Sequence, residues 1–220
     1  MTLKLYYHPF ASFCQKALIA FYENDIAFEP EIVDLGDPDS RAAFAAVWPL
    51  AKFPVLRDEA RDLTIPESTT VIEYLAQTFP GGAQLIPSDP AGALQARLWD
   101  RFHDNYVAAP MQKIVTDRLR PAGSEDPQGV AEARALLGTA YGILETEMAA
   151  KTWAVGEAFT LADCAAAPAL YYANLVQPFD RERPHLQAYF DRLLARPSFA
   201  RVVEEAKPYR PLFPQERGTA

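Results

Sequence analysis

The chain has 220 residues, with 21 Lys and Arg against 29 Asp and Glu, a net charge of −8, and half of its residues are hydrophobic. This length suits one large or two small domains, and the hydrophobic share is enough for sizeable cores. The acidic balance, without a cluster of Lys and Arg, argues against nucleic acid or an anionic membrane as a partner. A local positive site for a small anion remains compatible with this charge.

Targeting signals and cysteines give a second set of expectations. No stretch approaches the run of about 20 apolar residues that spans a bilayer, and the N-terminus lacks the basic and apolar regions of a secretory signal. The two cysteines, Cys14 and Cys164, lie far apart in the sequence and form no disulfide framework. We therefore expect a cytoplasmic protein.

Residues 3–21 contain the stretch around which the rest of the chain is organised. Leu3–Tyr7 is a short apolar and aromatic run that predicts a buried strand, and Pro9 ends it. A helix is predicted from Ser12, with Ser12 as its N-cap. A strand that runs directly into a helix N-terminus places free N–H groups and a positive dipole end at the turn. Such a turn is suited to hold an anion, including a thiolate.

Strands and helices are predicted to alternate as far as residue 79. Further strands are expected at 26–33, 54–56 and 63–65, and further helices at 38–47 and 68–79. Pro80-Gly81-Gly82 ends the last helix, and a linker rich in Pro, Gly and Ser follows. The sequence thus predicts a small α/β domain at 1–80 and a linker at 81–92.

The rest of the chain, 93–220, is predicted to be an all-helical domain. The expected helices are 93–119 with a bend at Pro110, 127–150, 161–175, 184–195 and 198–206. Thr160 and Asp163 form a capping box before the third of these helices, and we assign them a structural role.

Four motifs, in order, resemble the cytosolic glutathione S-transferase family over nearly the whole chain. They are YYHPFASFCQKALIA near the N-terminus, Lys52-Phe53-Pro54-Val55, Pro66-Glu67-Ser68, and the segment from Gly156 to Asp163. The resemblance implies a thioredoxin-like N-terminal domain, an all-helical C-terminal domain and a homodimer. Each motif alone is weak, and the fold also hosts non-catalytic proteins.

The resemblance implies an enzyme that binds glutathione as co-substrate and stabilises its thiolate. The thiolate would conjugate or reduce a small apolar electrophile, as in detoxification, without a metal or other cofactor. A non-catalytic binding or regulatory protein is one alternative. It stays open because Ala11 falls where many relatives carry a catalytic Ser or Cys. A glutathione-dependent isomerase similar to maleylacetoacetate isomerases is another, although the turn here departs from the Ser-rich turn expected of it.

Ser12 is the candidate catalytic residue, as a hydroxyl donor to the glutathione sulfur. Lowering a thiol pKa from about 8.5 to below 7 needs about 2–3 kcal/mol, and one hydrogen bond to a charged group supplies about 1.5–3 kcal/mol. Because Ala11 has no donor in its side chain, Tyr6, Tyr7 and backbone N–H groups remain alternatives. Cys14 is expected to be buried and inert, with a redox role only if its thiol is accessible.

Six residues are predicted to bind glutathione: Lys52, Phe53, Pro54, Val55, Glu67 and Ser68. The resemblance implies a cis bond before Pro54, which would let the backbone of Val55 pair with the extended peptide. Lys52 would contact the glycyl carboxylate. At a helix N-terminus, Ser68 suits the γ-glutamyl carboxylate and Glu67 its ammonium group.

Further candidates are expected near the junction of the two domains. The pocket for the second substrate is expected between the domains, with candidates Phe10, Phe102, Tyr106, Met111 and Tyr171. Asp100 or Asp104 would reach the ammonium group of the partner subunit's glutathione, unless both belong to a solvated helix face. His103 and His185 have no companions at a catalytic or metal-ligand spacing, and we assign them no role.

Overall fold

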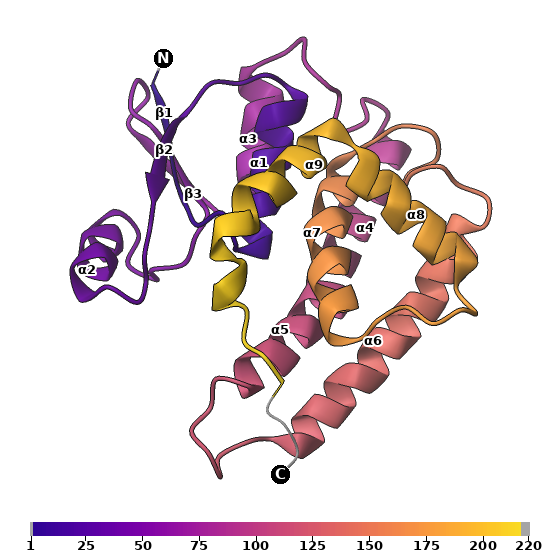
Figure 1. Cartoon of the computed structure of the whole chain (residues 1–220). Helices are drawn as coiled ribbons and strands as arrows, with labels where there is room; N and C mark the ends of the chain where they lie inside the picture. Colours follow the sequence, from indigo (N-terminus) through magenta and orange to yellow (C-terminus); the bar gives the residue numbers. More distant parts are fainter. Residues whose placement is uncertain (1, 217–220) are drawn as a thin grey trace.

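The computed structural model describes residues 2–216 and has a smaller α/β part joined to a larger helical part (Figure 1). The strands are β1 (Leu3–Tyr7), β2 (Glu29–Ile32), β3 (Val55–Asp58) and β4 (Leu63–Pro66). They form one sheet in the order β2-β1-β3-β4, in which β1 and β2 are parallel and the other pairs antiparallel. The helices of this part are α1 (Ser12–Glu23), α2 (Pro38–Val47) and α3 (Ser68–Thr78).

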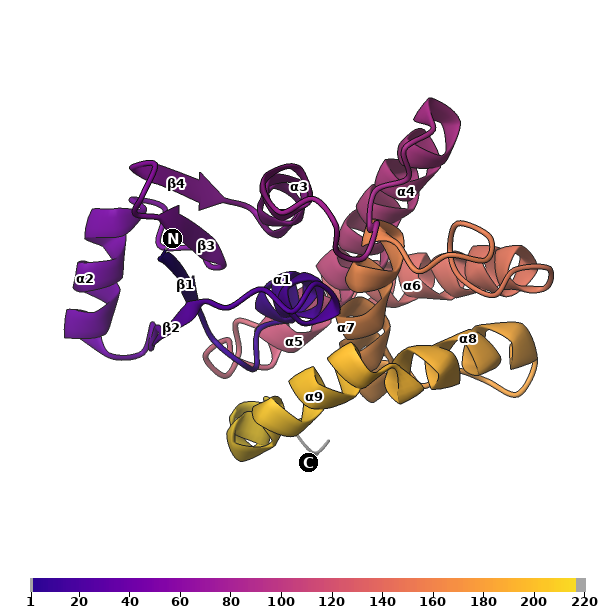
Figure 2. The same cartoon turned by 90° about the horizontal axis from the view of Figure 1, so that it is seen from above.

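Helices α1 and α3 lie on one face of the sheet and α2 on the other (Figure 2). Successive side chains of a strand point to opposite sides of the sheet. Strand β1 therefore offers aromatic side chains to the helices on both faces. Tyr6 stacks on Phe44 of α2, with ring centroids 5.8 Å apart, whereas Tyr7 meets Phe28 on the side of α1. The two tyrosines therefore belong to different layers.

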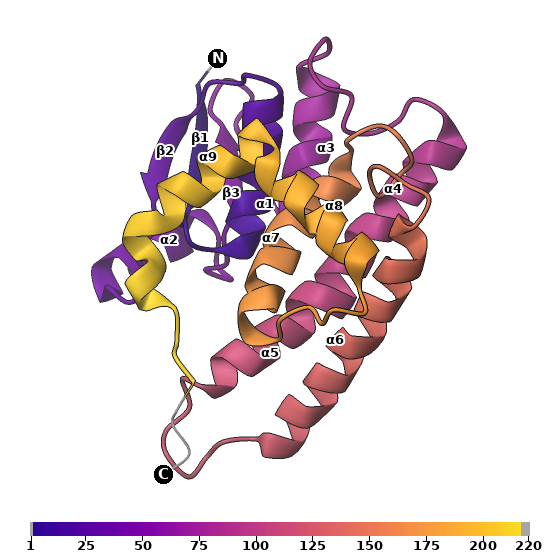
Figure 3. The ribbon, with the colours of Figure 1, turned by 45° about the vertical axis from the view of Figure 1, so that its right-hand side comes forward.

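The helical part follows as eight consecutive segments. They are α4 (Pro90–Phe102), the π-helical η1 (His103–Ala108), α5 (Ala109–Asp117), α6 (Pro127–Met148), α7 (Leu161–Val176), α8 (Pro184–Ala195), α9 (Pro197–Ala206) and the 3₁₀-helical η2 (Lys207–Leu212). Helix α7 is almost wholly buried and packs against α1, and α9 crosses α1 on another side (Figure 3). The predicted fold class, a thioredoxin-like domain followed by an all-helical one, is confirmed.

Most predicted bounds agree with the structure within two residues, and three features differ more. The strand expected at 26–33 is only β2, an edge strand whose four residues are all exposed. The bend expected at Pro110 is a π-helical turn just before it, because proline offers no N–H and its ring crowds the carbonyl four residues earlier. Helix α4 starts at Pro90, inside the predicted linker, since the side chain of Asp89 caps it by accepting a hydrogen bond from Gly92 N.

The predicted capping box of α7 is present and is part of a larger network. Asp163 accepts a hydrogen bond from Thr160 N at 2.8 Å, and also from Ala154 N at 2.8 Å and from the Tyr189 hydroxyl at 2.7 Å. Burial raises the pKa of this carboxyl group. One side chain thus ties the loop before α7, the start of α7 and helix α8 together.

Within residues 2–216, none of the helices combines the length and the apolar character needed to cross a bilayer.

Candidate active site at the domain junction

The turn between β1 and α1 presents the Ser12 hydroxyl without a capping role. Helix α1 begins at Ser12, and Ala11 is the N-cap, with an extended backbone at φ −90° and a carbonyl that accepts from Gln15 N. The prediction that Ser12 is the N-cap is therefore wrong by one residue. The Ser12 hydroxyl has no hydrogen-bond partner in the part of the chain that the structure describes, so it remains available to a ligand.

Helix α7 holds this turn in place from behind. The Tyr172 hydroxyl donates to Phe10 O at 2.9 Å. The side-chain amide of Gln15 donates to Pro9 O at 2.9 Å and to the Tyr172 hydroxyl oxygen at 3.0 Å. Because Tyr172 belongs to the helical domain, the position of the Ser12 turn depends on both domains.

A cavity of about 520 Å³ lies against this turn. Ser12 and Phe10 come from the turn, and Lys52 and Phe53 from the segment before β3. Helix α5, the turn after it and the C-terminal segment contribute a mostly apolar wall, consisting of Met111, Val115, Leu119, Leu212, Phe213 and Pro214. The cavity thus joins one free hydroxyl, at a helix N-terminus, to a space suited to an apolar molecule.

Of the residues predicted for the second substrate, Phe10 and Met111 line this cavity and the others do not. Phe102 packs against Trp99 with ring centroids 4.9 Å apart, and Tyr106 is 48% exposed. Tyr171 accepts a hydrogen bond from Arg210, and its neighbour Tyr172 lines the cavity instead. Adjacent helix residues lie about 100° apart, so only one of this pair faces the site.

The Phe53–Pro54 bond is cis, as expected. Val55, however, lies inside the sheet, in register with Tyr6 on one side and Pro66 on the other, and its side chain is wholly buried. Val55 does not line the cavity, whereas Lys52 and Phe53 do. The cis-proline segment therefore meets the site through the residues before the proline.

The N-terminus of α3 lies on the same face of the sheet as α1 (Figure 2), and its free backbone N–H groups are suited to an anion. Ser68 is the first residue of α3 and is buried, and Glu67 before it is exposed. Glu67 has φ +68°, in the left-handed region, and its side chain makes no capping hydrogen bond. At this cap, no side-chain hydrogen bond occupies the first N–H groups of α3. The Glu67 carboxylate interacts electrostatically with Arg101.

A buried ion network fixes the distance between these two helix N-termini. Lys16 of α1 is 1% exposed, and its Nζ lies 2.5 Å from Asp100 Oδ1 and 2.8 Å from Asp104 Oδ2. Nζ also donates to Thr69 in the first turn of α3, at 2.9 Å. The solvated face considered for the two aspartates is therefore wrong, because both are buried against this lysine.

Sequence reasoning missed Lys16 and its neighbour Arg101. Arg101 donates to Thr69 Oγ1 at 2.5 Å and bonds both network aspartates. Burial raises the pKa of Asp104, while Lys16 opposes this effect. The available signal was a single lysine within the apolar run of α1, which a core helix tolerates only when the charge is paired.

The remaining candidates for thiol chemistry lie elsewhere. Cys14 is fully buried, its Sγ accepts a hydrogen bond from His8 N at 3.5 Å, and burial raises the pKa of its thiol. Neither Tyr6 nor Tyr7 lines the cavity that contains Ser12. Among residues 2–216, no group of three His, Cys, Asp or Glu side chains is arranged to hold a metal ion.

Comparison with known proteins gives a consistent result. Residues 5–83 match the glutathione S-transferase N-terminal domain, and residues 102–197 match the C-terminal domain. A glutathione S-transferase-like protein from Fusarium, LUC7, is 32% identical over 175 residues, which cover 78% of this chain and 77% of that protein. The tobacco glutathione S-transferase PARB is 25% identical over 213 residues, covering 93% and 99%.

Among solved structures, a glutathione S-transferase from Methylobacillus flagellatus KT with glutathione bound superposes with a TM-score of 0.83. It is 27% identical, and the match covers 91% of this chain and 98% of that one. With both domain models matched in order and a relative above 30% identity, the chain belongs to the glutathione S-transferase family.

Proposed function

We propose that the protein is a glutathione transferase in which the Ser12 hydroxyl stabilises the glutathione thiolate. The observation that carries this proposal is the free Ser12 hydroxyl at the N-terminus of α1, which opens onto an apolar cavity of about 520 Å³. The similar structure from Methylobacillus flagellatus, which has glutathione bound, supports glutathione as the ligand.

Three chain segments would hold the tripeptide. The γ-glutamyl carboxylate would accept hydrogen bonds from Ser68 and the first N–H groups of α3, and the Glu67 carboxylate would pair with the ammonium group. The extended backbone would lie along Phe53, and Lys52 would meet the glycyl carboxylate. This arrangement leaves the cysteinyl sulfur to reach the turn at Ser12.

The free energy needed to ionise the glutathione thiol near neutral pH is small enough for this arrangement to supply. Lowering a thiol pKa from about 8.5 to below 7 takes about 2–3 kcal/mol. A hydroxyl that donates to the sulfur anion contributes about 1.5–3 kcal/mol, and the helix N-terminus adds about 0.3–1 kcal/mol. Ser12 and α1 together therefore suffice without a nucleophilic protein side chain.

The reaction follows from the composition of the cavity. The thiolate attacks an electrophilic carbon of a molecule held against Met111, Val115 and Phe213, and a thioether forms as the leaving group departs or the double bond takes up a proton. Apolar walls favour hydrophobic electrophiles and exclude water from the sulfur, so the anion stays a strong nucleophile.

The test is to titrate the protein with glutathione across pH and to count bound thiolate by ultraviolet difference absorbance. Wild type and Cys14→Ala should form thiolate near neutral pH, and Ser12→Ala should need a pH higher by about 1–2 units. Turnover of a panel of aryl halides and enones should fall with the thiolate. If glutathione binds and no thiolate forms in wild type, the protein is a binding protein of this fold.

We also propose a homodimer, based on exposed apolar side chains of the helical part. Leu94 and Leu98 lie one turn apart on α4 and are 66% and 53% exposed, and Leu136 and Ile143 are exposed on α6. Sedimentation at micromolar concentration should give a dimer, and Leu98→Lys should weaken it. A wild-type monomer would contradict this proposal.

A cytoplasmic location is part of the same proposal. Both cysteines are free thiols in the structure, which suits a reducing compartment. Fractionation of the source cells should place the protein with the soluble reduced fraction, and recovery from an oxidising compartment would contradict it.

A further inference from the structure

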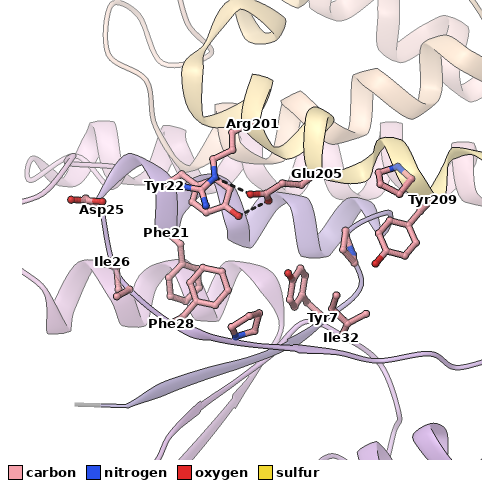
Figure 4. Close-up of a pocket in the computed structure, with 14 residues that line it drawn as sticks. Tyr7, Phe21, Tyr22, Asp25, Ile26, Phe28, Ile32, Arg201, Glu205 and Tyr209 are labelled. Atoms are coloured by element: carbon pink, nitrogen blue, oxygen red, sulfur yellow. Dashed lines mark hydrogen bonds and ion pairs between the residues drawn. The ribbon is translucent and has the colours of Figure 1, made fainter.

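A second cavity, of about 570 Å³, lies between strand β2 and helix α9 (Figure 4). We call it the α9 cavity and define it by Tyr7, Phe21, Phe28, Ile32, Arg201 and Tyr209, which line it. It shares no lining residue with the cavity at Ser12. His8 separates the two, because its ring contacts Phe53 of one cavity and Tyr209 of the other.

Aromatic rings make up the floor of the α9 cavity. Phe28 lies 4.6 Å from Phe21 and 6.3 Å from Tyr7, measured between ring centroids. Tyr209 enters from the C-terminal segment η2, opposite the strand (Figure 4). Ring faces and edges at these spacings suit a flat aromatic guest, which packs with the same offset and edge-on geometries.

Two hydroxyl groups in this cavity lack partners. Neither the Tyr7 nor the Tyr209 hydroxyl makes a hydrogen bond within residues 2–216. Burial raises the pKa of Tyr7, so its hydroxyl remains a neutral donor at physiological pH. The Tyr22 hydroxyl, by contrast, is occupied, because it donates to Glu205 Oε2 at 2.6 Å. A guest with an acceptor oxygen would supply the missing partner for the free phenols.

The charged groups of the cavity disfavour an anion. The single lining cation, Arg201, already donates to Glu205 Oε1 at 2.9 Å and lies over the ring of Tyr22, 3.8 Å from its centroid. The lining acids are Glu205 and Asp25, which leave the cavity with an excess of negative charge. Glu205 is satisfied by Tyr22 and Arg201 and offers little to a cation.

We propose that the α9 cavity is a second ligand site, which binds a neutral, flat aromatic molecule that carries a carbonyl acceptor. The volume lies within the usual range for small-molecule sites. The carbonyl would accept from the Tyr7 and Tyr209 hydroxyls, and the rings would pack on the half-buried rings of Phe28 and Tyr209. The site needs no glutathione and stands apart from the function proposed above.

The test uses the full chain and the naphthyl ketone probe 6-propionyl-2-(dimethylamino)naphthalene, measured by equilibrium dialysis so that added tryptophans do not disturb the signal. Ile32→Trp fills the α9 cavity from an edge-strand position that is 48% exposed. Leu119→Trp is the matched control, which fills the cavity at Ser12 from a position 67% exposed. Both changes are at exposed positions, and a circular dichroism melt checks that each variant folds.

Ile32→Trp should lower the affinity for the probe at this site at least tenfold, and Leu119→Trp should change it less than twofold. Ala27→Trp, at an exposed lining position, gives a second block if Ile32→Trp does not fold. Tyr209→Phe should cost about three- to tenfold, the range of one hydrogen bond. Binding that survives both blocks, or that only Leu119→Trp abolishes, overturns the proposal. Tighter binding of the anionic 8-anilino-1-naphthalenesulfonate or of an N-methylquinolinium cation overturns the ligand class.

Discussion

The buried histidine of the π-helical turn makes the stability of this protein sensitive to acid. His103 is wholly buried, and its Nδ1 lies 2.7 Å from Trp99 O. Its Nε2 has no hydrogen-bond partner within the described residues. The ring is therefore neutral and donates through Nδ1. A second proton would create a buried N–H without an acceptor, close to the cation of Lys16.

Burial lowers the pKa of His103 from its usual 6.5 to about 4, with the Trp99 carbonyl and Asp100 opposing the effect and Lys16 adding to it. Between these values the unfolded chain binds the proton and the folded chain does not, so the free energy of unfolding decreases as pH falls. At 1.36 kcal/mol per pH unit, the whole loss is about 3 kcal/mol, complete below pH 4. At pH 5.5 it is about 1.4 kcal/mol.

The assay is urea unfolding at fixed protein concentration at several pH values between 7.5 and 4.5, for wild type, His103→Gln and the control His185→Gln. His103→Gln keeps a donor for Trp99 O and does not titrate, whereas His185 is exposed. Between pH 7.5 and 4.5, the free energy of unfolding of wild type should fall by about 2–3 kcal/mol more than that of His103→Gln, because only wild type has a histidine at this position. The control should run parallel to wild type. If the free energy of unfolding of His103→Gln changes with pH as much as that of wild type does, the argument is refuted.

Three further changes test other parts of the structure. Asp163→Ala should lower the free energy of unfolding by more than the ~0.5–2 kcal/mol of an ordinary cap. The reason is that Ala154 N, Thr160 N and the Tyr189 hydroxyl all lose their acceptor. A smaller loss in urea unfolding would contradict this. Lys16→Met should cost up to about 3–5 kcal/mol, because it removes the buried cation between Asp100 and Asp104 and leaves them only the half-exposed Arg101. A stability equal to wild type would show that the two aspartates are protonated or hydrated. Both cysteines are buried, so a thiol reagent should react with them only in denaturant, and a fast phase in native buffer would disprove their burial.

Much of the fold was predictable because it depends on local pattern. The alternation in Leu3–Tyr7 predicts a strand with two covered faces, and the structure places Tyr6 and Tyr7 in different layers. The prolines and the capping box predict helix starts, which depend on backbone N–H groups within a few residues. The helices at 38–47 and 184–195 have the predicted bounds for this reason.

The candidate site was predictable only in part, because its geometry depends on contacts between distant segments. The sequence singled out Ser12, the cis bond before Pro54 and the start of α3. A shift of the helix start by one position decides whether the Ser12 side chain caps the helix or faces a ligand. Helix propensities do not define a helix end to a single residue. The choice of Tyr172 over Tyr171 depends on the rotation of α7 against α1.

What the sequence alone determined is the order of elements, the family and the turn that could hold an anion. The tertiary structure decided which side chains share a space. It paired Lys16 with two aspartates from another domain, and it placed Tyr7 and Tyr209, some two hundred residues apart, in one cavity. The physical reason is that periodicity and capping act over a few residues, whereas burial and ion pairing depend on which surfaces meet after the chain has folded.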